Sequence, residues 1–326
     1  MAGLEVAVAI ALPAAITVPH FLPLHRVSPF LAATVWLCSL CLRALVAVGA
    51  AIFVLLYLPQ TGVYDAIAHW CWHEALPLVA THLGLSGHPL IHAAIVLPGL
   101  ALAASLVWAL FGFARAWVAI RHKLRRALGQ GPHGSTIIKD SEIIVGVTGL
   151  GRSRILISDG ALGVMDAEEL EASMNHELGH IQRRHRPVLI LASVLGALGR
   201  TLPGTRSAEA ELRFSLERDA DQYAVRCTSD PLALASAICK AATARPLAGT
   251  AALGGSGRVI ARLDHLEGVS RPAGPRLERA VRAVALALIL MTLGLLVAVP
   301  SWALAAPSAQ HVLSASASSC PEKASH

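Results

Sequence analysis

The sequence predicts a mainly α-helical membrane protein with four membrane-spanning helices and a soluble α+β domain between the third and fourth helices. Three observations carry this prediction. Of the 326 residues, 55% are hydrophobic and only 15% are charged, which is unusual for a soluble chain. Four stretches are apolar over the roughly 20 residues needed to cross a bilayer. A long polar stretch separates the last two of them.

The four expected spans are residues 4–22, 30–58, 90–113 and 281–303. The first lacks a basic leading segment and an obvious small-residue cleavage site, so we expect a span there and not a removed signal peptide. Arg43 interrupts the second span. It either faces the interior of the helix bundle or divides a long helix from a shorter true span.

Basic residues cluster beside the spans. They follow the third span and precede the fourth, at Arg115, Arg121, Lys123, Arg125 and Arg126, and at Arg271, Arg276, Arg279 and Arg282. The loop 59–89 contains no Lys or Arg. The positive-inside rule therefore predicts that 114–280 is cytoplasmic and that both termini are extracytoplasmic. This location also explains the formal charge of +6 without direct contact to nucleic acid.

Four regions follow from these limits. Residues 1–120 are a three-span membrane region with a His-rich outer loop, 121–280 a cytoplasmic domain, 281–303 the fourth span, and 304–326 a Ser/Ala-rich tail expected to be disordered. The outer loop is either an ordinary interfacial aromatic loop or a metal-binding or pH-sensing one, because His69 and His73 have helical spacing. A disulfide between Cys71 and Cys320 is a further open prediction.

The cytoplasmic region begins with residues 121–135, whose basic residues, glycines and proline predict a linker. The β-branched runs 143–147 and 154–158 flank a Gly-containing turn and predict a β-hairpin. One of its strands either binds an extended peptide by strand addition or is purely structural. The apolar run 187–199 is too short for a span, so we expect a buried or re-entrant helix at the membrane face.

The most informative motif is His176-Glu177-Leu178-Gly179-His180. Asp166 and Glu169 have the spacing of a helix capping box, and the apolar residues that follow recur at helical intervals. On a helix, residues four apart share a face, so His176 and His180 can bind one Zn²⁺ ion. Glu177 can then act as the base that takes a proton from water. Gly179, a poor helix former, indicates close approach of substrate or another helix.

A second helix supplies the remaining candidates. It is expected to run from a Ser207 cap to about Cys227. Glu217 and Asp221 lie on one face of it, where burial is costly without a partner. Glu217 is the candidate third zinc ligand, and Asp221 is placed to orient a ligand histidine. Tyr223 and His265 are weaker candidates for a donor to the oxyanion of the reaction.

The run Glu217-Arg218-Asp219-Ala220-Asp221 after His176–His180 resembles the gluzincin membrane peptidases, over about residues 140–265. Two families fit: the protease motif resembles the HtpX and CAAX-prenyl-protease type, peptidase family 48, and the order of spans resembles the BlaR/MecR type, family 56. Either resemblance implies an α+β gluzincin zinc protease domain. It implies His176, His180 and Glu217 as zinc ligands, Glu177 as base and Asp221 as orienting residue. The BlaR/MecR proteins carry a penicillin-binding sensor domain after the last span, whereas a Ser/Ala-rich tail follows it here, so we do not expect β-lactam sensing.

We therefore expect a zinc-dependent endopeptidase of the cell membrane that cleaves a protein or peptide at the cytoplasmic face of the lipid bilayer. A transcriptional repressor and misfolded membrane protein are both candidate substrates. Two alternatives remain at this stage. One is a non-catalytic signalling scaffold with a structural zinc, whose site would be closed by four protein ligands. The other is a small transporter, suggested by Arg43 and by prolines within the apolar segments.

Overall fold

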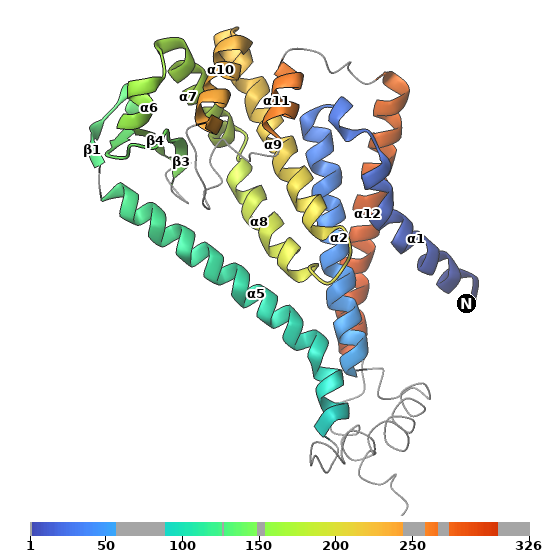
Figure 1. Cartoon of the computed structure of the whole chain (residues 1–326). Coiled ribbons are helices and arrows are strands. Elements are labelled where there is room, and N and C mark those ends of the chain that lie inside the picture. The colour runs from blue at the N-terminus through green and yellow to red at the C-terminus, as the bar shows by residue number, and fades with distance from the viewer. Residues whose placement is uncertain are drawn as a thin grey trace, which may run out of the picture.

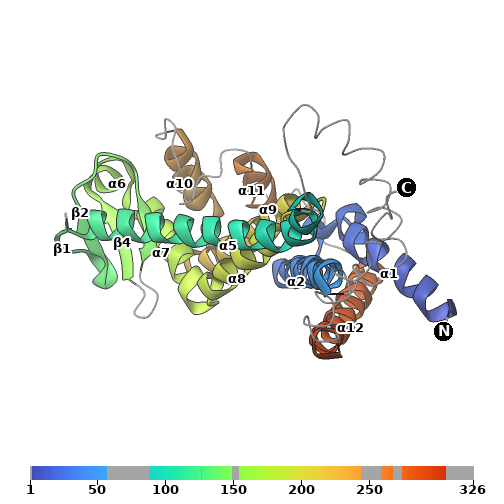
Figure 2. The same ribbon diagram turned by 90° about the horizontal axis from the view of Figure 1, so that it is seen from below.

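The computed structural model describes residues 2–56, 89–125, 127–148, 154–243, 258–266 and 274–305. Helices α1 (Ala2–Phe21), α2 (Pro29–Leu56) and α12 (Pro275–Ala305) lie together in one part of the molecule. A small sheet lies at the other end, and α5 (Pro89–Leu124) runs obliquely from the far end of α2 to this sheet (Figure 1). The view from below shows α5 crossing α8 (His185–Leu198) on the way (Figure 2).

Among the described residues, three helices are long and apolar enough to cross a membrane. The segments are Pro29–Leu55, Leu97–His122 and Pro275–Ser301, and they confirm apolar helices at the second, third and fourth expected spans. In α1 the apolar segment Ile10–Phe21 is shorter than a helix needs to be to cross a membrane. The first expected span therefore stays a prediction. Helices α5 and α12 exceed their expected limits because the flanking basic residues continue the helix.

Arg43 faces the interior of the helix bundle. Its side chain is fully buried and donates hydrogen bonds to the hydroxyl of Ser39 and to the carbonyl oxygens of Ile16, at 2.8 Å, and Pro203, at 3.5 Å. It also lies 2.8 Å from Nε2 of His20. These partners satisfy a guanidinium that would otherwise be costly to bury. The first of the two interpretations of Arg43 is therefore correct.

A helical hairpin packs against the membrane helices. It consists of α8 and α9 (Thr205–Thr228), which lie beside α2 in Figure 1. Ala208, Leu212 and Leu216 of α9 belong to the same buried cluster as Trp36 and Leu40. Helix α8 has 14 residues and returns through α9, which confirms a short helix at this position. Only part of it is buried, and its location at the membrane face stays a prediction. The turn between them needs Gly204, whose φ is 78° and whose missing Cβ would lie 2.9 Å from His20 Nε2.

In the described part of the chain the sheet has four strands in the order β1-β2-β4-β3. They are β1 (Ala127–Gln130), β2 (Thr136–Ile138), β3 (Val145–Thr148) and β4 (Arg154–Ser158). The expected hairpin is present as antiparallel β3 and β4, and β2 runs parallel to β4. The predicted linker 121–135 is wrong. After α5 the chain forms β1, because the turn closed by Gly131 N–H and Ser135 C=O, 2.8 Å apart, lets it pair with β2.

Three more helices complete the soluble part: α6 (Asp159–Val164), α10 (Pro231–Thr243) and α11 (Val259–Leu266). One face of α7 (Ala167–Gln182) packs on β3 and β4 through a core that includes Val145, Ile155 and Met174. The described cysteines Cys38, Cys41, Cys227 and Cys239 are not joined by disulfide bonds. The His-rich loop and the Cys71–Cys320 pair lie outside the described residues. So does the expected tail, except for its first two positions, which are the last two residues of α12.

Candidate metal centre

Helix α7 forms as its local sequence predicts. Asp166 accepts a hydrogen bond from the N–H of Glu169, and the Glu169 carboxylate accepts one from the N–H of Asp166, at 2.8 and 3.0 Å. The apolar side of the helix, with Met174 and Leu178, packs on the sheet core. His176 and His180 consequently lie together on the side of α7 that faces α9, with their ring centroids 4.8 Å apart.

Helix α9 is positioned by packing. The expected Ser207 cap is wrong, because the helix begins at Thr205 after Gly204, and Gly204 provides no side-chain cap. Its first turns pack on α2, and its middle crosses α7 at Gly179. A Cβ at Gly179 would lie 3.2 Å from Cα of Ala220. The close approach that Gly179 predicted is therefore that of another helix.

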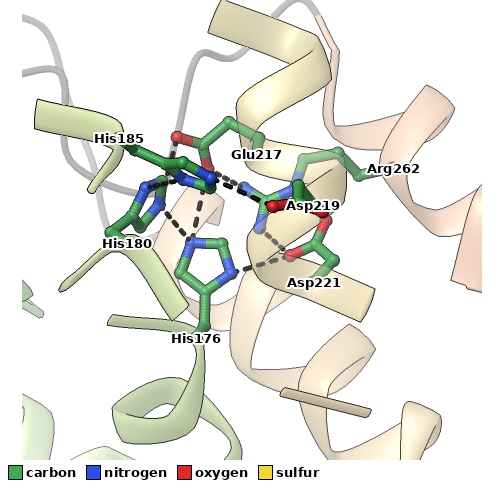
Figure 3. A network of polar contacts seen from close by, with 7 residues as sticks. All are labelled: His176, His180, His185, Glu217, Asp219, Asp221 and Arg262. Atoms are coloured by element: carbon green, nitrogen blue, oxygen red, sulfur yellow. Dashed lines mark hydrogen bonds and ion pairs between the residues drawn. The ribbon is translucent and has the colours of Figure 1, made fainter. Parts of the chain in front are cut away.

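The crossing brings two histidines and one glutamate together (Figure 3). Nε2 of His176 lies 3.1 Å from Nε2 of His180, and the Glu217 carboxylate lies 3.4 Å from the first and 3.6 Å from the second nitrogen. Tetrahedral Zn²⁺ with bonds of 2.0–2.1 Å places its ligand atoms about 3.3 Å apart. The three donor atoms therefore fit a zinc ion. Among the described residues these three side chains are the group with metal-ligand spacing.

The outer nitrogen of each histidine has its own partner. Nδ1 of His176 lies 2.8 Å from a carboxylate oxygen of Asp221. Nδ1 of His180 lies 2.9 Å from Nδ1 of His185, and Nε2 of His185 lies 3.1 Å from Asp219. Contacts of this kind fix the tautomer and ring orientation, so that both Nε2 atoms face one point. Asp221 is located as the sequence predicted, whereas the His185–Asp219 pair was missed.

Arg262 closes the site from α11. Its guanidinium donates to both carboxylate oxygens of Asp221, at 2.6 and 2.9 Å, and lies 3.3 Å from Glu217. It is 4% exposed, so the paired carboxylates are what makes this charge tolerable in the interior. Sequence analysis missed Arg262, because an arginine 41 positions after Asp221 has no local signal. His185 could have been suspected from its place five residues after His180.

The electrostatics of the centre favour a cation. Burial by itself lowers the pKa of His176, but Asp221 and Glu217 outweigh it and raise this pKa to about 9. Burial lowers the pKa of His180 to about 3, which keeps this imidazole neutral. Burial raises the pKa of Glu217, yet the hydrogen bond with His176 and the positive charges of His176 and Arg262 bring it well below its ordinary value. One neutral imidazole and an ionised carboxylate suit a divalent metal.

Glu177 lies beside the cluster, 6% exposed. Burial raises the pKa of its carboxyl group to about 7, although a hydrogen bond from the N–H of Val147 in β3 acts against this. Tyr223 and His265 are not brought to the three ligand atoms by any contact among the described residues. Burial and the neighbouring Cys227 raise the pKa of Tyr223, and His265 lies 3.2 Å from Gln222. Their role as oxyanion donors stays a prediction that the geometry does not support.

The site thus combines a small sheet with two crossed helices. One helix carries His-Glu-x-x-His, and the other carries a glutamate at zinc spacing. Residues 137–268, from β2 to the segment just after α11, match the sequence model of peptidase family M48. This match supports a membrane-associated zinc metallopeptidase of the M48 type. The three long apolar helices agree with a membrane protein. The search of curated proteins found no match to the chain.

Proposed function

We propose that the chain is a membrane-bound zinc endopeptidase that cleaves protein substrates at the cytoplasmic face of the membrane. The observation that carries the proposal is the convergence of His176, His180 and Glu217 at zinc spacing beside the buried Glu177. Three donors leave one coordination position for water or substrate, as in catalytic sites. A structural zinc in a signalling scaffold would require a fourth donor, and the described residues offer three.

His176, His180 and Glu217 would hold the ion, which when bound supplies a Lewis acid that polarises the scissile carbonyl group. Glu177 removes a proton from the attacking water and passes it to the nitrogen of the leaving amine. A carboxyl group with a pKa of about 7 is suited to both steps, because it exchanges protons readily near neutral pH. Asp221 and the His185–Asp219 pair keep the two histidines in the orientation that metal binding requires.

The open edge of strand β3 favours a substrate that binds in an extended conformation. Among the described residues β3 is an outer strand of the sheet, it packs against α7, and its Val147 lies close enough to Glu177 to lower the pKa of that carboxyl group. A peptide that adds to this edge as a further strand would pass beside the base. This arrangement favours an endopeptidase, because strand addition reads the backbone in the middle of a chain and does not require a terminus.

The cytoplasmic orientation of the site is supported by charge. In the described helices the basic residues Arg115, Arg121, Arg276, Arg279 and Arg282 lie at the ends of α5 and α12 that adjoin the soluble part. The positive-inside rule assigns these ends to the cytoplasm. Candidate substrates are a transcriptional repressor or misfolded membrane proteins, and both are accessible from that side.

The test uses the full-length protein in detergent or nanodiscs. Glu177→Gln should retain one zinc ion per chain and lose cleavage, whereas His180→Ala should lose both. Proteins that accumulate on Glu177→Gln in cells, identified by mass spectrometry, would name the substrate. A Glu177→Gln variant with full activity would contradict the assigned base. Cleavage that continues after complete removal of zinc would contradict the metallopeptidase proposal itself.

A further inference from the structure

Helix α5 has one face that packs and another that the described part of the chain leaves exposed. It contacts α8 and α2. The partly buried positions near its C-terminal end are Phe113, Ile120 and Leu124, which recur at helical spacing and therefore share one face. No residue of Leu97–His122 is fully buried by the described residues. The rest of the helix surface is therefore open to a partner.

Basic side chains gather on this open surface. Arg115, Arg121 and Arg125 are all exposed, and they lie within about 15 Å along the helix. The guanidinium of Arg115 lies 5.9 Å from the ring centre of Phe111, and that of Arg121 lies 5.1 Å from the ring centre of Trp117. A contact with a ring face orients a guanidinium but uses none of its N–H groups on an acceptor oxygen, so these groups can still donate to an anion.

Acidic side chains do not balance the charge of this surface. The sequence contains no Asp or Glu between Glu74 and Asp140, and in the described part of the chain no ion pair joins the three arginines to a carboxylate. The basic end of α12 differs, because Arg282 there donates to Glu278 at 2.7 Å. The exposed surface of α5 therefore carries a net positive charge that favours an anionic partner.

Apolar side chains continue the same surface toward the N-terminal half of α5. Val107 and Trp108 are each 65% exposed and Phe111 is 54% exposed, and the rings of the last two lie 6.4 Å apart. Because Leu97–His122 is long and apolar enough to cross a membrane, these side chains would face acyl chains while the arginines reach the headgroups. An anionic phospholipid has a charged head and apolar chains in this order, whereas a nucleic acid has no counterpart to the apolar half.

We propose that the exposed face of α5 over residues 107–125 binds anionic phospholipids, with the headgroup phosphates at the three arginines and the acyl chains along Trp108 and Phe111. Helix α5 ends at Leu124 and β1 begins at Ala127. Lipids bound to α5 therefore hold the β1 side of the sheet at the membrane surface. This inference does not depend on the zinc site or on the proposed peptidase activity.

The experiment places the full-length protein in phosphatidylcholine nanodiscs that contain a small fraction of phosphatidylglycerol brominated on its acyl chain, which quenches tryptophan fluorescence on contact. The reference contains the same fraction of brominated phosphatidylcholine. Trp108 and Trp117 are the reporters, and their signal is the difference from protein with Trp108→Phe and Trp117→Phe. We expect phosphatidylglycerol to be enriched about tenfold around these reporters, because each basic residue at the surface attracts anionic lipid. Equal quenching by the two lipids would overturn the proposal.

Arg121→Gln combined with Arg125→Gln should reduce the enrichment to about twofold. Arg121→Lys combined with Arg125→Lys should keep most of it, because a phosphate accepts hydrogen bonds from either cation. Arg276→Gln with Arg279→Gln is the matched control, since it removes the same charge from α12 and should leave the enrichment unchanged.

Three outcomes would overturn the proposal. Equal losses in the α5 and α12 glutamine variants would mean that only the general surface charge attracts the lipid. Loss of the enrichment in the lysine variant would mean that the arginines act on the structure of α5 and not on a phosphate. Binding of single-stranded RNA without lipid enrichment would assign the surface to nucleic acid.

Discussion

Helices α7 and α9 contribute to one metal centre but are positioned in different ways. Helix α7 begins with a complete capping box and packs on the sheet through a regular apolar face. Helix α9 begins after a glycine in the left-handed region, has no side-chain cap, and packs its first turns on the membrane helix α2. Two candidate ligands thus come from a locally specified helix, and the third comes from a helix placed by tertiary contacts.

This difference connects the metal centre to the membrane part. Arg218, next to Glu217, is 3% exposed and donates to the carbonyl oxygens of Leu24 and Val27 in the connection between α1 and α2, at 3.5 and 3.2 Å. Arg43 of α2 donates a hydrogen bond to the carbonyl oxygen of Pro203, which lies just before α9. The position of Glu217 therefore depends on the membrane helices, whereas the positions of His176 and His180 depend mainly on the sheet.

The largest effect is expected at the α9 ligand. Glu217→Ala leaves α7 unchanged but removes one of three zinc donors, so zinc affinity should fall by more than about 100-fold and cleavage should be lost. Chelator competition and the zinc content per chain measure this. Glu211→Ala, on the same helix outside the cluster, is the control and should retain zinc. A Glu217→Ala protein with undiminished zinc would show that α7 suffices.

The partner contacts from α9 should matter next. Asp221→Asn weakens the contact to His176 and leaves the buried Arg262 without its full partner, so zinc affinity should fall about 10- to 100-fold and stability should also fall. Adding Arg262→Gln should restore stability but not zinc affinity, because only the buried charge is removed. Recovery of zinc affinity in the double variant would contradict the role of Asp221 on His176.

The hydrogen bonds between α9 and the α1–α2 connection can be removed without changing the metal ligands. Arg218→Met removes the donors to Leu24 and Val27 at similar side-chain length and should destabilise the protein by about 2 kcal/mol. Thermal unfolding in detergent and zinc affinity report the loss. Arg206→Met, at an exposed position of α9, is the matched control. If both variants behave alike, α9 does not depend on the α1–α2 connection.

The smallest effect is expected at the start of α7. Asp166→Ala removes the cap that accepts from the N–H of Glu169 and should cost about 1 kcal/mol. Zinc affinity should change little, because the sheet core still holds the helix. Unfolding midpoints in denaturant measure the loss, with Asp166→Asn as the conservative variant that keeps a cap. A loss of zinc comparable to that of Arg218→Met would remove the contrast between the two helices.

The apolar helices, the β3–β4 pair and α7 were predictable because each has a local cause: a long apolar run, a β-branched run beside a turn, or a capping box. The predictions that were wrong, the Ser207 cap and the linker, also have physical explanations. Ser207 has a good capping side chain, but packing on α2 and the turn at Gly204 start α9 earlier. Strand β1 has little strand propensity of its own and forms because β2 provides hydrogen-bond partners.

By itself, the sequence determined the class of chemistry, because His176, Glu177 and His180 are spaced by the period of a single helix and need no distant information. It also indicated Glu217 and Asp221, which share a face of a second helix. Only the tertiary structure decided how the two helices cross at Gly179, and that His185, Asp219 and Arg262 complete the surroundings. Those contacts join residues up to 45 positions apart, and their geometry is set by packing rather than by any local pattern.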